Sequence, residues 1–239
     1  MLLISRLILV LLFMIYLLIM SILRFSLQPR HPKHVACVAR NFSRLARIFG
    51  VKLIVRKPAG LNDAGPYVFV GNHQNNYDLV TMTAAVQPGT VSVGKKSLVW
   101  VPIFGFVYWL SGNILIDRNN KSKAVGTISA VADRIRKGHL SIWMFAEGTR
   151  SRGRGLLPFK TGAFHTAIQA EVPIVPVCCS NTHNKIKLNR WDNGEVIIEI
   201  MAPIPTVGLE RSSVRKLSTD VHAIMKKRID ELSVEARDA

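Results

Sequence analysis

A histidine and an aspartate five residues apart, His73 and Asp78, are the side chains whose types and spacing best fit catalysis. They follow residues 67–70, an apolar run typical of a strand, and polar groups at the end of a strand are common working residues in α/β sheets. Across a turn into a helix, the carboxylate can hold one imidazole nitrogen while the other takes a proton. No protein nucleophile accompanies the pair, so a substrate hydroxyl would attack. The alternative is a structural histidine beside a helix-capping aspartate.

A second polar segment follows another apolar run, at residues 145–152. It contains Glu147 and then a turn in which Gly148 and Thr149 offer backbone and hydroxyl donors beside Arg150. The planar fork of arginine matches phosphate geometry, and each charge-assisted bond of this kind contributes roughly 1.5–3 kcal/mol. The segment therefore predicts a phosphate-binding turn.

Two further segments complete the set. Residues 112–118 form a strand-like run that ends in an acid and a base, Asp117 and Arg118. Residues 172–177 form an apolar strand with two prolines, which is expected to be core or the wall of an apolar chain.

Short β-branched and aromatic runs alternate with helical periods over most of the chain. This alternation predicts an α/β fold with a mixed, mostly buried sheet flanked by helices. One helix is expected around the apolar stripe 124–135, ending near Gly138, and another over residues 214–232. The expected strands are 51–55, 67–70, 91–93, 114–116, 140–145, 174–179 and 196–200.

The N-terminal region is predicted to associate with a membrane. Residues 7–23 are almost wholly apolar and lie between Arg6 and Arg24. At about 1.5 Å per residue the run reaches ~26 Å, so it either spans a core of ~30 Å or lies within one leaflet. A cleaved signal peptide is the alternative, but no small-residue cleavage site follows. The basic residues that come after it predict that the rest of the chain lies on the cytoplasmic side.

Residues 33–49 form a second, amphipathic helix, with Arg40, Arg44 and Arg47 opposite its apolar positions. Such a helix suits the headgroup region of a membrane, or it packs as an ordinary helix on the soluble core. We therefore divide the chain into a membrane-associating helical pair, 1–50, and an α/β domain, 51–239.

The net charge of +17 arises from 32 Lys and Arg against 15 Asp and Glu. Ten basic residues precede the first acid, Asp63, beside the apolar segment, and a second basic block covers residues 95–160. With 49% hydrophobic residues the chain is too apolar for a disordered basic tail. Anionic lipid headgroups and a phosphorylated substrate explain the two blocks, so nucleic acid is not expected as a partner.

Cysteine and metal chemistry are not expected. The three cysteines include two neighbours, Cys178 and Cys179, inside an apolar strand, which is typical of core filling in a reducing cytoplasm. The histidines show no spacing typical of a metal site, so no metal and no bound cofactor is predicted.

Taken in order, the four segments resemble the blocks of the glycerolipid acyltransferase family, and most of all its bacterial 1-acyl-sn-glycerol-3-phosphate acyltransferase branch. They are Asn-His-Gln-Asn-Asn-Tyr-Asp, Leu-Ile-Asp-Arg-Asn-Asn, Phe-Ala-Glu-Gly-Thr-Arg and Val-Pro-Ile-Val-Pro. The resemblance covers nearly the whole chain. One departure is Ala146, which stands where the family has proline and removes no reactive group.

The resemblance implies a bacterial inner-membrane enzyme of phospholipid biosynthesis. It would move a fatty acyl group from acyl-CoA or acyl-acyl carrier protein to the sn-2 hydroxyl of lysophosphatidate, giving phosphatidate. His73 would act as the base and Asp78 would orient it. The expected contacts to the acceptor phosphate are Glu147, Gly148, Thr149 and Arg150, with Arg118 and its neighbour Asp117 completing that end, and Lys95 or Lys96 facing the thioester oxyanion or the CoA phosphates.

Two other functions remain open at this point. The same chemistry could acylate another lyso-lipid or glycerol 3-phosphate. A membrane-tethered protein that binds anionic lipid or nucleic acid without catalysis is more remote, because Phe159 is the only aromatic residue among the basic residues 150–160.

Overall fold

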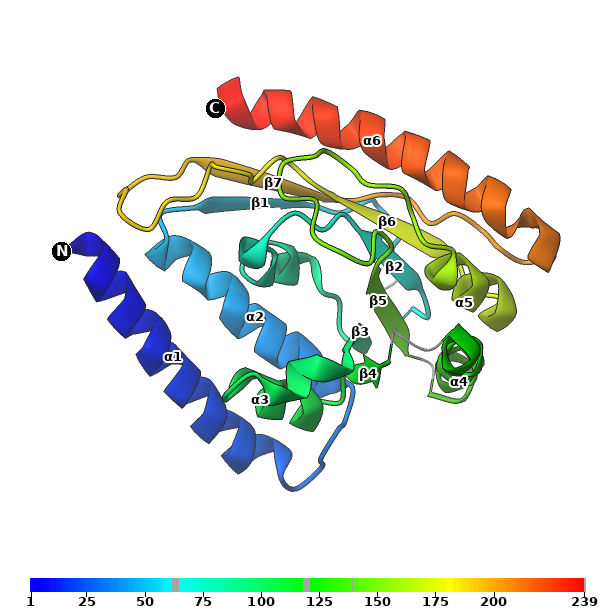
Figure 1. The fold of residues 1–239 in the computed structure, drawn as a ribbon, viewed down its shortest axis with the longest axis horizontal. Helices are drawn as coiled ribbons and strands as arrows, with labels where there is room; N and C mark the ends of the chain where they lie inside the picture. The colour runs from blue at the N-terminus through cyan, green and yellow to red at the C-terminus, as the bar shows by residue number, and fades with distance from the viewer. Residues whose placement is uncertain (62–64, 118–120, 139, 239) are drawn as a thin grey trace.

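The computed structural model describes residues 1–61, 65–117, 121–138 and 140–238. Within these ranges seven strands form one sheet in the order β1-β7-β6-β2-β5-β3-β4 (Figure 1). Each begins and ends within two residues of its predicted range. The predicted mixed α/β architecture is therefore confirmed. The strands are β1 (Lys52–Arg56), β2 (Val68–Gly71), β3 (Thr90–Lys95), β4 (Ile114–Ile116), β5 (Ser141–Phe145), β6 (Ile174–Cys179) and β7 (Glu195–Ile200).

The directions of the strands bring the polar segments to one edge of the sheet. β6, β2, β5, β3 and β4 run parallel to one another, whereas β7 is antiparallel to β6 and carries β1 beside it. Gly71, at the end of β2, lies in register with Phe145, at the end of β5. Segments that follow these two strands therefore start level with each other, at the carboxyl edge where α/β proteins place their sites.

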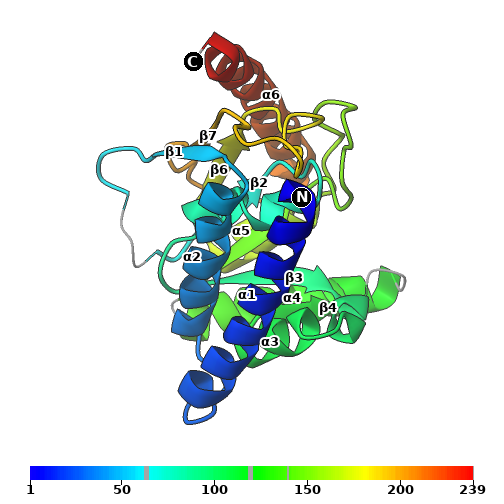
Figure 2. The ribbon, with the colours of Figure 1, turned by 90° about the vertical axis from the view of Figure 1, so that its left-hand side faces the viewer.

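Helices cover both faces of the sheet (Figures 1 and 2). One hydrophobic cluster joins the sheet to α4, α5 and α6, and a second joins it to α1, α2 and α3. The short α3 and α5 were not predicted. The helices are α1 (Leu2–Phe25), α2 (Lys33–Ile48), α3 (Phe104–Leu110), α4 (Lys121–Gly138), α5 (Gly162–Ala170) and α6 (Val214–Asp238), with four 3-10 helices, η1 (Asn76–Leu79), η2 (Met82–Ala85), η3 (Lys96–Trp100) and η4 (Arg211–Ser213).

The apolar side of α2 packs into the protein. Val38, Phe42 and Leu45 are buried in the same cluster as Val175 of β6, while the arginines on the opposite side are exposed. The sequence left two environments open for this helix, the headgroup region of a membrane and the soluble core. The apolar side of α2 packs on the core. Because α2 shares a core with the sheet, the division at residue 50 stays a prediction.

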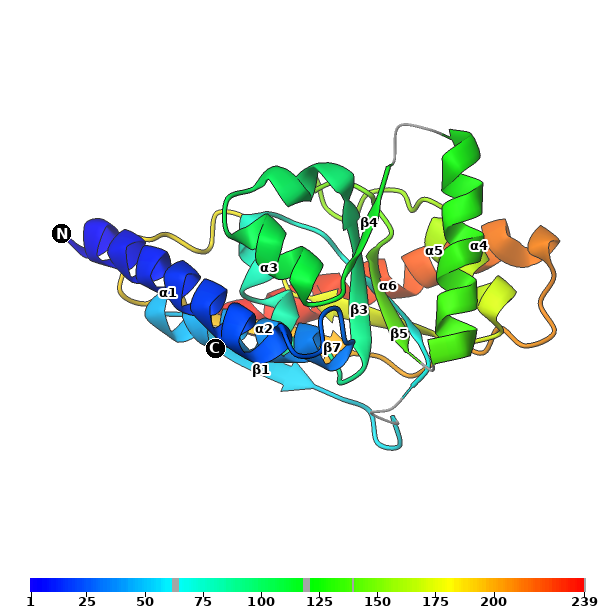
Figure 3. The same cartoon turned by 90° about the horizontal axis from the view of Figure 1, so that it is seen from below.

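α1 exposes an apolar surface, and a few of its side chains contact the rest of the protein. It has a mean hydropathy of 2.8 over its most apolar window, long and apolar enough to cross a membrane, and only 11% of that window is buried. Leu17 and Phe25 are fully buried against the protein. Arg6 is 3% exposed, and its guanidinium donates to the carbonyls of Leu188 (3.0 Å) and Arg190 (2.6 Å) in the β6–β7 connection. Figure 3 shows α1 lying along the body of the protein beside α2 and α3.

Candidate active site

His73 and Asp78 meet directly after β2. The Nδ1 atom of His73 lies 2.6 Å from Oδ2 of Asp78, which is 4% exposed and sits in η1. The same oxygen accepts the backbone N–H groups of Gln74 (2.7 Å) and Asn75 (3.1 Å). Asp78 therefore does both things considered from the sequence: it caps the short helix, and it holds one ring nitrogen of the histidine.

The imidazole ring lies on the face of the sheet that carries α1 and α2. It stacks on Phe145 at the end of β5, with ring centroids 4.2 Å apart and planes 15° from parallel. Phe145 packs against the cluster that contains Leu17 of α1 and Phe42 of α2. The His73 side chain is 19% exposed, so the ring edge is reachable while Nδ1 is taken by Asp78. Nε2 is the ring nitrogen available to a substrate.

Glu147 holds the histidine loop from β5. Its carboxylate is 3% exposed and accepts the backbone N–H of His73 (2.6 Å) and of Leu157 (2.9 Å). Burial raises the pKa of this carboxyl above its ordinary value, against the opposing effect of the two N–H donors. The family resemblance implied that Glu147 contacts the acceptor phosphate. The oxygens of Glu147 are instead engaged by the backbone, and a carboxylate does not attract phosphate.

A further pair of backbone bonds joins the two loops. The N–H of Ser151 donates to the carbonyl of His73 (2.8 Å), and the N–H of Arg152 donates to that of Gln74 (3.0 Å). The segments after β2 and β5 are thus one structural unit, as their level starting points require.

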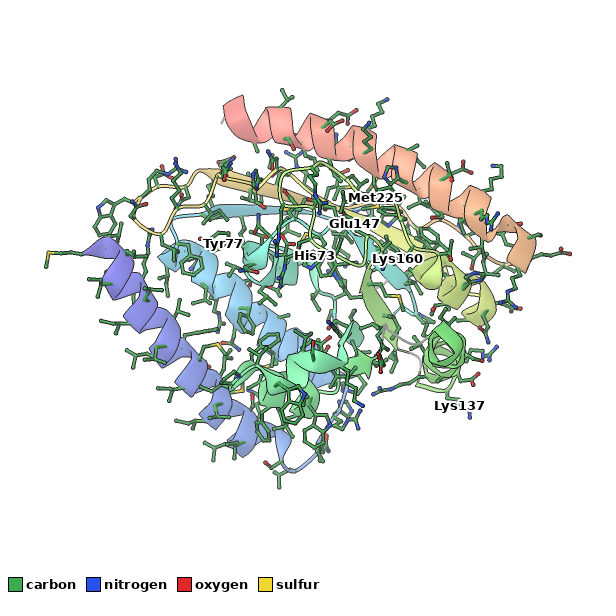
Figure 4. The ribbon with its side chains drawn as sticks, in the orientation of Figure 1. His73, Tyr77, Lys137, Glu147, Lys160 and Met225 are labelled. Carbon is green, nitrogen blue, oxygen red and sulfur yellow. The ribbon has the colours of Figure 1, made fainter. Side chains whose placement is uncertain are left out.

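The turn after Glu147 lies beside Lys160, and Figure 4 shows these two labelled residues near each other. Gly148 has φ of +69°, a conformation that glycine adopts without strain, and a Cβ there would lie 2.9 Å from Cε of Lys160. Thr149 and Lys160 are exposed, and the Nε of the half-buried Arg150 has no hydrogen-bond partner among the described residues. The N–H of Lys160 donates to the carbonyl of Ala146 (2.8 Å), which keeps this lysine beside the turn.

The other predicted residues lie farther along the same edge. Lys95 ends β3, the neighbour of β5, and Lys96 begins η3; both are exposed. Asp117 follows β4, the outermost strand. Arg118 lies outside the described residues. Lys95, Lys96 and Asp117, together with Thr149, Arg150 and Lys160 of the turn, form the rim of the site, whereas His73, Asp78 and Glu147 form its centre.

Sequence analysis missed the buried amides that position the histidine loop. Asn72 exchanges two hydrogen bonds with the backbone of Cys179 (2.8 and 3.0 Å), and Gln74 accepts the N–H of Thr182 (2.8 Å). Asn72 and Gln74 lie on either side of His73. Their amide side chains, directly after the end of a strand, were the feature of the sequence that could have predicted this role. They tie the loop to β6.

Burial keeps the cysteine thiols protonated. It raises the pKa of Cys178 to about 12 and raises that of the fully buried Cys179 further, so neither is a nucleophile at neutral pH. Among the residues with described positions, no group of three or more His, Cys, Asp or Glu side chains could hold a metal ion.

Comparison with known proteins places this site in a family. A family model described as acyltransferase matches residues 52–180. The chain is 57% identical over 217 residues to the 1-acyl-sn-glycerol-3-phosphate acyltransferase of Haemophilus influenzae, covering 91% of this chain and 89% of that one. It is 56% identical to the enzyme of that name from Escherichia coli (88% and 86%) and 31% identical to the human alpha form (93% and 80%).

The fold is shared with a solved structure. The crystal structure of the 1-acyl-sn-glycerophosphate (LPA) acyltransferase PlsC from Thermotoga maritima superposes with a TM-score of 0.66 at 20% sequence identity, over 95% of this chain and 97% of that chain. Together with the sequence matches, this confirms the resemblance read from the four segments. The chain belongs to the acyltransferase family.

Proposed function

We propose that the chain acylates the sn-2 hydroxyl of 1-acyl-sn-glycerol 3-phosphate and so makes phosphatidate, a step of phospholipid biosynthesis. The observation that carries this is the 2.6 Å contact between His73 and Asp78, in a chain 57% identical to a relative named for that activity. The pair supplies a base with no protein nucleophile beside it, which is what direct attack by an acceptor hydroxyl requires.

In the proposed step, Nε2 of His73 takes the proton of the acceptor hydroxyl as that oxygen attacks the carbonyl carbon of an acyl thioester. A carbon–oxygen bond forms, the carbon–sulfur bond breaks, and the thiolate leaves with the electron pair. The imidazolium then returns its proton to the thiolate. Asp78 stabilises the transient positive charge on the ring through Nδ1. The donor is acyl-CoA or acyl-acyl carrier protein, since both present a thioester, and the step itself uses no other cofactor.

Glu147 acts as a positioning residue in this proposal, because its carboxylate holds the backbone at His73 and Leu157. The acceptor phosphate is bound by the hydroxyl of Thr149 and the guanidinium of Arg150, whereas the N–H of Gly148 already donates to the carbonyl of Phe145 (3.0 Å) and shapes the turn. Arg150 is half-buried and directly follows Thr149, so its guanidinium is the cation of the turn nearest to Glu147 in the chain. As the resemblance implies, Asp117 and Arg118 are assigned to the end of the site that takes the acceptor phosphate, and Lys95 or Lys96 to the thioester oxyanion or the CoA phosphates.

The acceptor lipid reaches His73 from the side of α1. His73 stacks on the same cluster that holds α1 and α2, and most of the outer surface of α1 is exposed and apolar. We infer that α1 lies within one leaflet, an arrangement that keeps its contacts with α2 and α3. The basic residues after α1 support a position of the α/β domain on the cytoplasmic side of the bacterial inner membrane.

An acceptor panel tests the reaction. Purified chain in mild detergent is incubated with labelled acyl-CoA or acyl-acyl carrier protein and either 1-acyl-sn-glycerol 3-phosphate, another lyso-phospholipid or glycerol 3-phosphate. We expect labelled phosphatidate from the first acceptor in preference to the others. Preferential labelling of another lyso-lipid or of glycerol 3-phosphate would overturn the acceptor assignment, and no labelled product with any acceptor would overturn the activity.

A further inference from the structure

A second cluster of cations lies at the opposite edge of the sheet from His73. It lines a groove of about 800 Å³ between the connection from α1 to α2 and the last turn of α4. His31 and Lys33 come from the connection and the start of α2, and Arg134 and Lys137 come from α4. The groove also touches Leu140, directly before β5.

This groove is separate from the active site. Leu140 precedes the first residue of β5, whereas Glu147 follows its last, so the two regions are about 20 Å apart along the strand. Figure 4 shows Lys137 on α4, well away from His73 and Glu147. A ligand in the groove would not touch the reacting atoms.

The positive charge in the groove is poorly neutralised. Asp133 is the one acid in its lining, and its carboxylate pairs with Arg136. Within the described part of the chain, Lys33, Arg134 and Lys137 form no ion pair, and Arg134 donates only a long bond, 3.4 Å, to the carbonyl of Gly112. Burial, and then the nearby charge of Arg30, lower the pKa of Arg134. An anionic ligand would relieve this repulsion.

The surroundings of the groove are those of a membrane interface. Leu23, in the last turn of α1, and Leu27, in the connection that leads to the groove, are 74% and 89% exposed. In the same connection, the guanidinium of Arg30 lies 5.7 Å from the ring centre of Trp109, which is exposed. Apolar side chains, a tryptophan and arginines together are typical of the headgroup level.

We propose that this groove binds the phosphate of an anionic phospholipid headgroup, as a site distinct from the acceptor site. Arg134 offers two donors in a plane to the phosphate oxygens, and Lys33 and Lys137 add point charges. The site would hold the α4 side of the protein against an anionic membrane.

Binding is measured by calorimetric titration of the full chain in neutral detergent with dioctanoyl phosphatidylglycerol, dioctanoyl phosphatidylcholine or inorganic phosphate. The double variant Arg134→Gln with Lys137→Gln should lose about thirtyfold in affinity for the phosphatidylglycerol, because it removes two charges near the headgroup. The matched control, Arg215→Gln with Lys227→Gln, removes two exposed charges from α6, neither of which lines the groove. It should stay within about twofold, because it lies outside the groove.

Each other outcome contradicts the proposal. Equal losses in both double variants would indicate a general effect of net charge. Equally tight binding of inorganic phosphate would assign the groove to a free anion, and equal binding of phosphatidylcholine would remove the role of charge. If the double variant had a lower Tm but an unchanged affinity for phosphatidylglycerol, Arg134 and Lys137 would only stabilise the C-terminal end of α4. A raised KM for the acyl acceptor would join the groove to the active site. The titration measures binding and requires no acyl transfer. Its result therefore tests the groove even if the chain does not catalyse the proposed reaction.

Discussion

The centre of the active site and its cationic rim are built in different ways. Asp78 and Glu147 are buried, and their oxygens are held by hydrogen bonds of 2.6–3.1 Å. Thr149 and Lys160 on the rim are exposed, and Arg150 keeps a donor unused among the described residues. Proton transfer depends on reacting atoms placed within fractions of an ångström, whereas attraction of a phosphate tolerates movement. Changes at the centre should therefore lower kcat, and changes at the rim should raise KM.

The largest effect is expected for His73→Ala, which removes the base. kcat should fall by about 10²–10⁴, the usual contribution of general base catalysis. The variant should remain folded and bound to the membrane, because Asp78 and Glu147 still hold the backbone of the loop through hydrogen bonds that do not involve the imidazole. Radiolabelled acyl transfer with vesicle sedimentation measures both. Asn76→Ala, at an exposed position in the same loop, is the control, and near-normal turnover by His73→Ala would defeat the mechanism.

A somewhat smaller loss, about 10² in kcat, is expected for Asp78→Asn. The amide oxygen can still accept the loop N–H groups, but the negative charge that stabilises the imidazolium is gone. KM for the acceptor should change little. Steady-state kinetics over a range of acceptor concentrations separates the two constants. A change confined to KM would show that Asp78 shapes the binding site and does not assist His73.

Arg150→Ala sharpens the contrast from the rim. It should raise KM for the acceptor at least about tenfold through the loss of a charge-assisted bond, with kcat nearly unchanged. Arg152→Ala removes an exposed arginine from the same turn and serves as the control. Matching rises in KM in both variants would mean that Arg150 acts through the general field, without a specific bond to the phosphate.

The smallest effect concerns stability and pH at Glu147. Its folded pKa is raised, so the protonated form favours folding. That contribution is complete below the ordinary value of 4.5 and is lost as pH rises through the raised value. The free energy of unfolding of the wild type, minus that of Glu147→Gln, should therefore fall with increasing pH in this window. Denaturant unfolding in mild detergent measures it, and a difference that rises with pH would contradict the raised pKa.

Local pattern predicted the strands well. Residues 114–116 and 174–179 begin and end as expected, because short β-branched runs between glycines, prolines and polar residues have few alternatives. α3 is apolar on all sides, so no period marked it, and α5 is short. α1 was expected to start after Arg6. The helix runs through this arginine because four carbonyls of a distant loop accept its N–H groups.

The sequence predicted which residues form the candidate site better than it predicted the role of each residue. His73 and Asp78 lie close in the chain, and their contact followed from spacing. The task of Glu147 depends on its bond to the backbone of His73, 74 residues away, which no local pattern specifies. The bridges of Asn72 and Gln74 to the end of β6 likewise depend on the order of the strands.

The binding of Arg6 to the β6–β7 connection has a mechanical consequence. An apolar helix alone in a leaflet can slide and roll, since a slip of one residue moves it by about 1.5 Å and turns it by roughly 100°. Here the guanidinium is held by the carbonyls of residues 187–191, against a glycine, Gly50, whose missing side chain leaves the space. The helix and the sheet must therefore rise, sink and tilt together. In the proposed position of α1 within one leaflet, the height of His73 in the membrane would follow that of the helix, because Arg6, together with Leu17 and Phe25, fixes the register between α1 and the rest of the protein.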